Sequence, residues 1–178
     1  VVARQAVQPA LDAGLSIDHK SHGAVTGEPG EPERFLRAID LAAESRVPAL
    51  VCWGPSEYGV GGYPEDPKFG PAWQAEIDAF YRAFERGVRA AEVANVVLLP
   101  KPHTGIGKHG RSLRELYDRF RSDAIGVCYD TGNVHYYEGL NPVDDVGHIA
   151  DLCRQLIVKD HVGPRASPVF CTPGDGDI

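Results

Sequence analysis

The sequence predicts an α/β protein built on parallel strands, for two reasons. Short runs of aliphatic and β-branched residues alternate with longer amphipathic segments along the chain, which is typical of parallel strands buried on both faces and joined by helices. Polar residues also follow these runs, at the strand ends where parallel α/β folds place their functional groups. Five such units suit either a doubly wound sheet or most of a (β/α)8 barrel.

Five segments carry the strand pattern, and each ends near a turn signal or a polar residue. They are residues 14–18, 47–53, 96–101, 125–130 and 155–160. No G-x-G-x-x-G motif follows the first of them, so a dinucleotide-binding fold lacks its usual phosphate-binding loop.

The segments between the strands carry helical patterns. Residues 32–45 are amphipathic, with Pro32 suited to a first helical turn. A longer helix is expected over 73–95, with an apolar stripe of Ile77, Phe80, Tyr81, Phe84 and Val88.

Two further helices and one loop complete the expected organisation. Ser112 and Glu115 have the spacing of a capping box and predict a helix start. Residues 141–154 carry the last helical pattern, and the Gly- and Pro-rich residues 54–70 are expected to form a loop.

Composition narrows the class of protein. The 178 residues suit one domain, residues 1–178, with 43% hydrophobic content and a net charge of −7. This acidic balance, without a Lys/Arg cluster, argues against a nucleic-acid partner. The sequence contains neither a membrane-spanning run nor a signal-peptide pattern, and its four scattered cysteines suggest neither disulfides nor a zinc site. We therefore expect a cytoplasmic protein.

The sequence contains no methionine and begins with "VVARQAV". These features lead us to expect a piece of a longer open reading frame. A partial barrel would expose unpaired strand edges, so we also expect this segment alone to be poorly soluble or to pair with another chain, as in a homo-oligomer.

The stretch "VCYDTGNVHYYEG" (127–139) raises the question of why an apolar strand should end on Asp130. Asp-Thr-Gly-Asn is favourable turn chemistry and could explain the residue by itself. Polar residues recur, however, at every other expected strand end: His19, Trp53, Lys101 with His103, and His161. That recurrence favours an active site to which Asp130 contributes.

Three motifs resemble those of the xylose-isomerase-like TIM-barrel superfamily, and more narrowly its sugar phosphate isomerase/epimerase group. They are "LPKPHTG" (99–105), "VCYDTGNVHYYEGLNPVDD" (127–145) and "LIVKDH" (156–161) with "PGDGDI" (173–178). The resemblance implies a (β/α)8 TIM barrel that is incomplete here. The five strands would correspond to the third through seventh, and the N- and C-terminal strands would be missing.

The resemblance also implies a divalent metal (Mn, Mg, Co or Zn) that polarises sugar oxygens while a carboxylate moves a proton. Asp130 falls on the aspartate ligand of the family. The preceding glutamate ligand falls on Lys101, the following histidine falls on Ile157, and a substrate-contacting histidine falls on Asn133. Of these ligand positions, only that of Asp130 still carries a metal-binding side chain. We therefore expect Lys101 and Asp130 to form an ion pair in place of the metal.

Lys101 and Asp130 are therefore the candidate catalytic pair, with Lys101 either an acid/base group or simply a lysine that extends into solvent. The candidate substrate-binding residues are His103, Asn133, His161, Trp53 and His19. "PGDGDI" offers backbone N–H groups for a phosphate, although its aspartates would repel an anion.

Three functions follow from these residues. The first is a sugar or sugar-phosphate isomerase/epimerase, with proton transfer between adjacent carbons of a carbohydrate. The second is a degenerate, metal-free barrel that binds carbohydrate without catalysis. The third, an apurinic endonuclease with a trinuclear zinc site, is disfavoured because its ligand positions carry Trp53, Lys101, Asn133 and Ile157.

Overall fold

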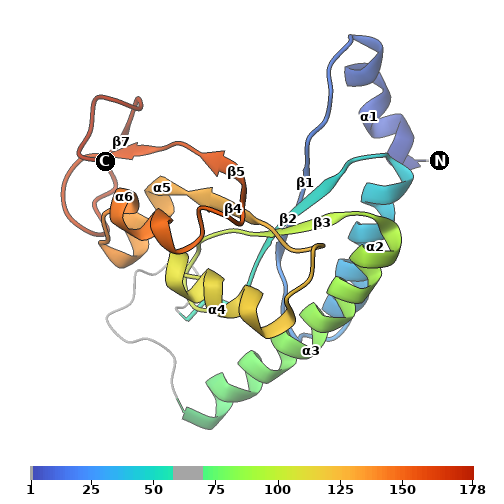
Figure 1. The fold of residues 1–178 in the computed structure, drawn as a ribbon, viewed down its shortest axis with the longest axis horizontal. Helices are drawn as coiled ribbons and strands as arrows, with labels where there is room; N and C mark the ends of the chain where they lie inside the picture. The colour runs from blue at the N-terminus through green and yellow to red at the C-terminus, as the bar shows by residue number, and fades with distance from the viewer. Residues whose placement is uncertain (1, 58–69) are drawn as a thin grey trace.

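Five parallel strands follow one another in sequence order and form an arc of a (β/α)8 barrel (Figure 1). The computed structural model describes residues 2–57 and 70–178. The strands are β1 (Lys20–Ala24), β2 (Ala49–Trp53), β3 (Val97–Pro100), β4 (Val127–Asp130) and β5 (Cys153–Ile157).

Parallel pairing brings the carboxyl ends of the strands together. Ala24 of β1 lies opposite Trp53 of β2, and Cys52 lies opposite Pro100 of β3. Asp130 of β4 lies opposite Ile157 of β5. An isolated parallel bridge between Leu98 and Ile125 joins the first three strands to the last two. The polar residues that follow β3, β4 and β5 therefore share one end of the arc.

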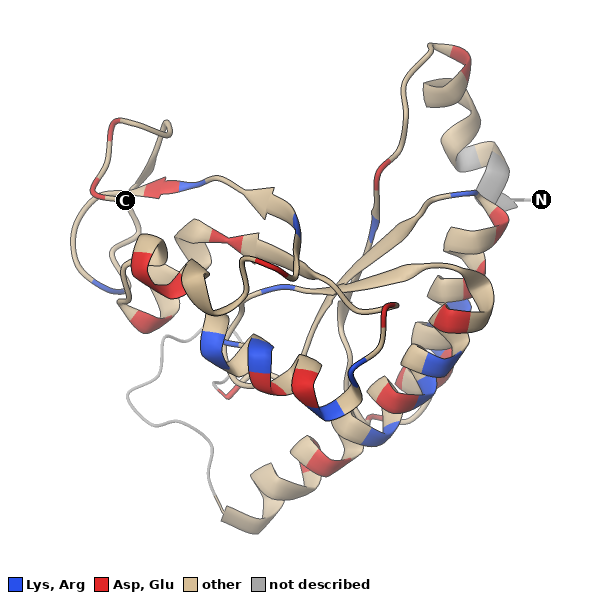
Figure 2. Ribbon diagram, in the orientation of Figure 1, with Lys and Arg blue, Asp and Glu red and all other residues tan. Residues whose placement is uncertain are grey.

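Helices cover the outside of the arc and connect the strands (Figure 1). The longer ones are α1 (Val2–Asp12), α2 (Glu31–Glu44), α3 (Gly70–Ala94) and α4 (Gly110–Phe120). The shorter ones are α5 (Thr131–Asn133), the π-helical turn η1 (Val134–Glu138), α6 (Pro142–Asp145) and the 3-10 turn η2 (Val146–His148). None of the helices in the described part of the chain is long and apolar enough to cross a membrane. Acidic and basic residues are interspersed along α2, α3 and α4 (Figure 2).

The expected strand at 14–18 is wrong, because β1 begins only at Lys20. Residues 15–19 have no regular structure: Leu15 is 62% exposed, and Ile17 packs partly buried against the core without joining the sheet. Periodicity in a run this short does not show which neighbouring segment has a pairing partner.

Two helix boundaries also differ from expectation. His109, rather than Ser112, is the N-cap of α4: the His109 side chain accepts a hydrogen bond from the Ser112 backbone N–H. The Ser112 hydroxyl accepts one in turn from the His109 N–H, so the capping box is present but begins three residues earlier. The helix expected at 141–154 ends as α6 and η2, after which β5 begins at Cys153.

The expected loop at 54–70 lies mainly outside the described residues, since 58–69 are not described. Its last residue, Gly70, begins α3, which starts three residues earlier than expected. Of the predicted apolar stripe of α3, Phe80, Phe84 and Val88 are buried. The four cysteines are free thiols.

The main core lies where α2 and α3 pack against each other and against the inner strands. Phe35 of α2 is fully buried and stacks on Phe84 of α3, with ring centroids 6.3 Å apart. Gly87 permits this approach: a Cβ placed there would lie 2.2 Å from Phe35 Cε1. A phenylalanine on one helix and a glycine on the other thus fix the distance between them.

A small antiparallel pair, β6 (Asp160–His161) and β7 (Phe170–Cys171), follows β5. The Asp160 carboxylate accepts hydrogen bonds from the backbone N–H groups of His161, Gly174, Gly176 and Ile178. Although burial opposes ionisation, these four donors lower the pKa of Asp160 to about 2. The "PGDGDI" segment therefore wraps a carboxylate of its own chain, and its donors at Gly174, Gly176 and Ile178 are not open to a phosphate.

Candidate active site

A charged cluster forms where β3, β4 and β5 end. Asp130 is the last residue of β4 and is fully buried. Its Oδ2 accepts a hydrogen bond from Lys101 Nζ at 3.1 Å and another from Lys159 Nζ at 2.8 Å. The ion pair expected between Lys101 and Asp130 is present, and a second lysine shares the same oxygen. We call Lys101, Asp130 and Lys159 the strand-end cluster.

The other oxygen of Asp130 has a structural role. Oδ1 accepts a hydrogen bond of 3.0 Å from the backbone N–H of Asn133 and so caps α5. Asn133 donates from its side chain to the carbonyl of Pro102 at 2.8 Å and accepts from Lys159 at 3.0 Å. The Asp130 carboxylate therefore both caps the turn and binds the two lysines. Asn133 links the cluster to the loop after β3 by its hydrogen bond to Pro102.

An aromatic surface adjoins the cluster. The His103 ring stacks on Trp53 with centroids 5.4 Å apart and an interplanar angle of 12°. Tyr137 also packs against His103, with ring centroids 4.8 Å apart and its hydroxyl 3.4 Å from His103 Nε2. Lys101 Nζ lies 5.4 Å from the centre of the Trp53 ring. Stacked rings beside polar groups are suited to a sugar, which has apolar C–H faces and hydroxyl edges.

His103 is expected to stay neutral well below the pH at which histidine usually protonates. Burial and the nearby Lys101 lower its pKa to about 4, although Asp130 acts in the opposite direction. Because the folded state binds fewer protons than the unfolded state between about pH 6.5 and 4, the free energy of unfolding should decrease as pH falls through this range. NMR of the ring protons should show a midpoint near 4, and a midpoint between 6 and 7 would contradict this environment.

One of the candidate substrate residues, His19, lies away from the strand-end cluster. His19 precedes β1 and is therefore at the opposite end of that strand from Ala24 and Trp53. Its Nδ1 lies 2.9 Å from Asp18 Oδ1 and 2.8 Å from Gln155 Nε2. The structure therefore does not bring His19 to the strand-end cluster.

His161 is fully buried in β6, where its ring packs against aromatic neighbours. The centroids of His135 and Phe170 lie 4.9 and 5.1 Å from that of His161, and its Nε2 contacts the Ser167 carbonyl. The described contacts give His161 a packing role in the β6–β7 hairpin.

Sequence reasoning omitted Lys159 and Tyr137 from the site. Period-two alternation offered a signal for Lys159, because residues 157 and 159 lie on one side of an extended chain, and Ile157 had been placed at the site. The reach of Lys159 depends on Gly132, where an added Cβ would lie 2.6 Å from Lys159 Cβ. Tyr137 reaches the site through the π-helical turn η1, which no sequence pattern indicated.

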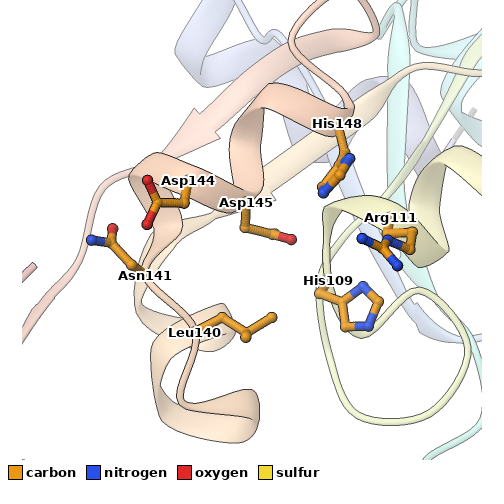
Figure 3. Close-up of a pocket in the computed structure, with 7 residues that line it drawn as sticks. All are labelled: His109, Arg111, Leu140, Asn141, Asp144, Asp145 and His148. Carbon is orange, nitrogen blue, oxygen red and sulfur yellow. The ribbon is translucent and has the colours of Figure 1, made fainter.

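A separate pocket of about 370 Å³ opens between the start of α4 and the α6–η2 segment (Figure 3). His109 and Arg111 line one side, and Asp144, Asp145 and His148 line the other. Asp145 Oδ2 is already bonded to the Gly110 N–H at 2.7 Å and to the Tyr129 hydroxyl at 2.8 Å. This carboxylate therefore joins α4 to β4, and the pocket lies apart from the strand-end cluster.

Comparison with known proteins defines the family. The family described as "Xylose isomerase-like TIM barrel" matches residues 20–178. The chain belongs to this family. No curated protein matches the sequence.

Solved structures share the fold at low sequence identity. A D-tagatose 3-epimerase-like protein superposes with a TM-score of 0.73 at 15% identity, covering 99% of this chain and 67% of that one. The 3-keto-D-glucoside 4-epimerase of E. coli gives 0.73 at 13%, covering 99% and 68%. A family member from Mycobacterium smegmatis, solved in complex with magnesium, gives 0.64 at 15%, covering 87% and 55%. The described strands thus form an incomplete barrel relative to these longer chains.

The residues of the strand-end cluster do not fit a divalent cation. The Asp130 oxygen that faces the site holds two ammonium groups, and Ile157 on the next strand has no donor atom. Within residues 2–57 and 70–178, no group of three or more His, Cys, Asp or Glu side chains is placed to hold a metal. A cation here would meet two positive charges and a single carboxylate.

Metal analysis of the purified protein tests this disagreement. We expect sub-stoichiometric Mn, Mg, Co and Zn after dialysis, because the ammonium groups repel a cation. A Lys101→Glu, Lys159→Ala double variant removes both positive charges and adds a carboxylate, so its metal content should rise. One tightly bound metal per chain in the natural protein would contradict the conclusion that the strand-end cluster does not fit a divalent cation.

Proposed function

We propose that this protein is a sugar isomerase/epimerase-like enzyme whose strand-end cluster replaces the metal of its family. One observation carries the proposal: Lys101, which follows β3, contacts through its Nζ the buried Asp130 at the end of β4. Lys101 is 13% exposed and lies beside the Trp53–His103 surface. The low-identity likeness to solved sugar epimerases supports the fold and makes a carbohydrate substrate reasonable.

In this proposal a sugar packs its C–H face on Trp53. Lys101 first releases one ammonium proton to solvent, its neutral amine then takes the proton from the carbon next to the sugar carbonyl, and the ammonium so formed returns a proton to that carbon or to the adjacent one. Asp130 holds the Lys101 amine in position and offsets part of the positive charge. Lys159 lies on the same oxygen, and its positive charge favours, without a direct hydrogen bond, the negative charge that develops on the sugar oxygen during proton transfer. These roles need no ligand other than the substrate.

Proton exchange measured in D2O tests the function without knowledge of the product. A panel of ketoses and aldoses is incubated with the protein, and NMR follows deuterium entering the carbon next to the carbonyl. Lys101→Ala should slow exchange about 100-fold or more, the usual scale for a general acid/base. Lys20→Ala, at the N-terminal end of β1, is the matched lysine control and should leave the rate unchanged. Equal exchange by Lys101→Ala and the natural protein would refute the role of Lys101.

A second function, carbohydrate binding without turnover, is favoured by one specific observation. Both oxygens of Asp130 are already occupied, Oδ1 by the Asn133 N–H and Oδ2 by two lysines, so this carboxylate is a poor general base. Binding of a sugar by calorimetry with no deuterium exchange across the panel would select this alternative.

A further inference from the structure

We propose that the strand-end cluster binds an anionic group of the substrate, so that the substrate is an acidic sugar carrying a carboxylate or a phosphate. This inference rests on the proposed function and adds the substrate class to it. The resemblance implied a metal cation at this end of the barrel. The positively charged strand-end cluster would bind an anion there instead.

Charge balance is the first argument. Two ammonium groups contact one carboxylate, so the strand-end cluster carries one uncompensated positive charge. His103 adds no charge at neutral pH, since its pKa is lowered to about 4. Lys101 is only 13% exposed, so solvent ions have little access to its charge, whereas Lys159 is 39% exposed and can meet a ligand. A partly buried positive charge is stabilised when a negatively charged group pairs with it.

Hydrogen-bond geometry is the second argument. A lysine ammonium has three N–H donors, and Lys159 uses two of them, on Asp130 Oδ2 and Asn133 Oδ1. The side chain of Lys159 is 39% exposed, so its remaining donor can meet a ligand. Its neighbour Lys101 donates to the same Asp130 oxygen. Because both ammonium groups lie within hydrogen-bond distance of one oxygen, a single carboxylate or phosphate beside that oxygen would be near both lysines.

The surroundings supply the rest of a sugar-acid site. Trp53 and His103 stack beside Lys101 and offer a flat face for the sugar ring. Nδ1 of His103 is buried without a hydrogen-bond partner among the described residues, and it can bond a hydroxyl group after a small movement of the ring. Together these groups place an apolar platform next to an anion seat.

Calorimetry with three probes that share one pyranose ring tests the proposal. Glucuronate carries a carboxylate, glucose 6-phosphate carries a phosphate, and glucose is the neutral reference. At low ionic strength we expect at least one anion to bind about tenfold or more tightly than glucose, the scale of one charge-assisted hydrogen bond. The preferred anion identifies the source of the charge, and added salt should weaken its binding. Equal affinity for all three probes would overturn the proposal.

Variants locate the effect. Lys159→Gln should weaken anion binding about tenfold more than it weakens glucose binding, whereas Lys159→Arg should retain most of the anion affinity. Asp130→Asn raises the net charge of the cluster while its side-chain oxygen can still cap α5, so it should bind the anion more tightly. Lys20→Gln is the matched control. Anion binding that is unaffected by Lys159→Gln, in variants with natural circular dichroism spectra, would place the anion elsewhere and sink the inference.

Binding and proton exchange separate the two proposals. An acidic sugar that binds through Lys159 without deuterium exchange would uphold the anion seat and refute the isomerase/epimerase function. Exchange on neutral sugars, with no preference for anions, would uphold the function and overturn the anion seat.

Discussion

Replacing Asp130 with alanine should destabilise the protein by about 3–5 kcal/mol, the usual cost of removing one partner from a buried ion pair. Asp130 is fully buried and receives hydrogen bonds from two lysines and the Asn133 N–H. Without it, two ammonium groups face each other and α5 loses its cap. Urea unfolding of the two proteins measures the difference as a shift in midpoint.

Two further variants separate charge from capping. Asp130→Asn should lose less stability than Asp130→Ala, because the amide oxygen still accepts from the Asn133 N–H. Asp40→Ala removes a carboxylate that is 61% exposed and 4.0 Å from Arg37, so it should change stability by less than about 1 kcal/mol. Equal losses for Asp130→Ala and Asp40→Ala would show that the strand-end cluster contributes nothing to stability.

Phe35→Ala should also cost about 3–5 kcal/mol, because it removes a fully buried aromatic ring between α2 and α3. The fixed approach of the two helices at Gly87 limits how far they can close the resulting cavity. Thermal or denaturant unfolding gives the magnitude, and Phe35→Leu should lose clearly less because it refills most of the volume. A loss below about 1 kcal/mol for Phe35→Ala would mean that the helices repack freely.

The arrangement of strands and helices could be predicted from sequence where long patterns and family motifs agree. Residues 32–45 and 73–95 fall on α2 and α3, because each carries an apolar face over several turns. Residues 14–18 resembled a strand, yet β1 lies further along, at Lys20–Ala24. A five-residue pattern carries little information about which segment finds a partner.

The candidate site could be predicted in part, for reasons of chain geometry. Lys101 and Asp130 lie at the ends of neighbouring strands, and their ion pair was expected because the family resemblance placed both on metal-ligand positions. His19 and His161 were placed by sequence proximity to strand ends, and both depend on details of local chain direction that sequence spacing does not supply. Lys159 needed the space left by Gly132, a three-dimensional contact between residues 27 positions apart.

The two lysines on Asp130 carry the same formal charge as one divalent cation, but they are attached to the backbone. A bound ion exchanges with its surroundings, so its occupancy follows the supply in the cell, whereas a side chain is present in every copy from the moment of synthesis. A site charged in this way would keep working under metal starvation and would not be mis-loaded by a competing ion. The concentration of available metal could not, in turn, regulate such a site.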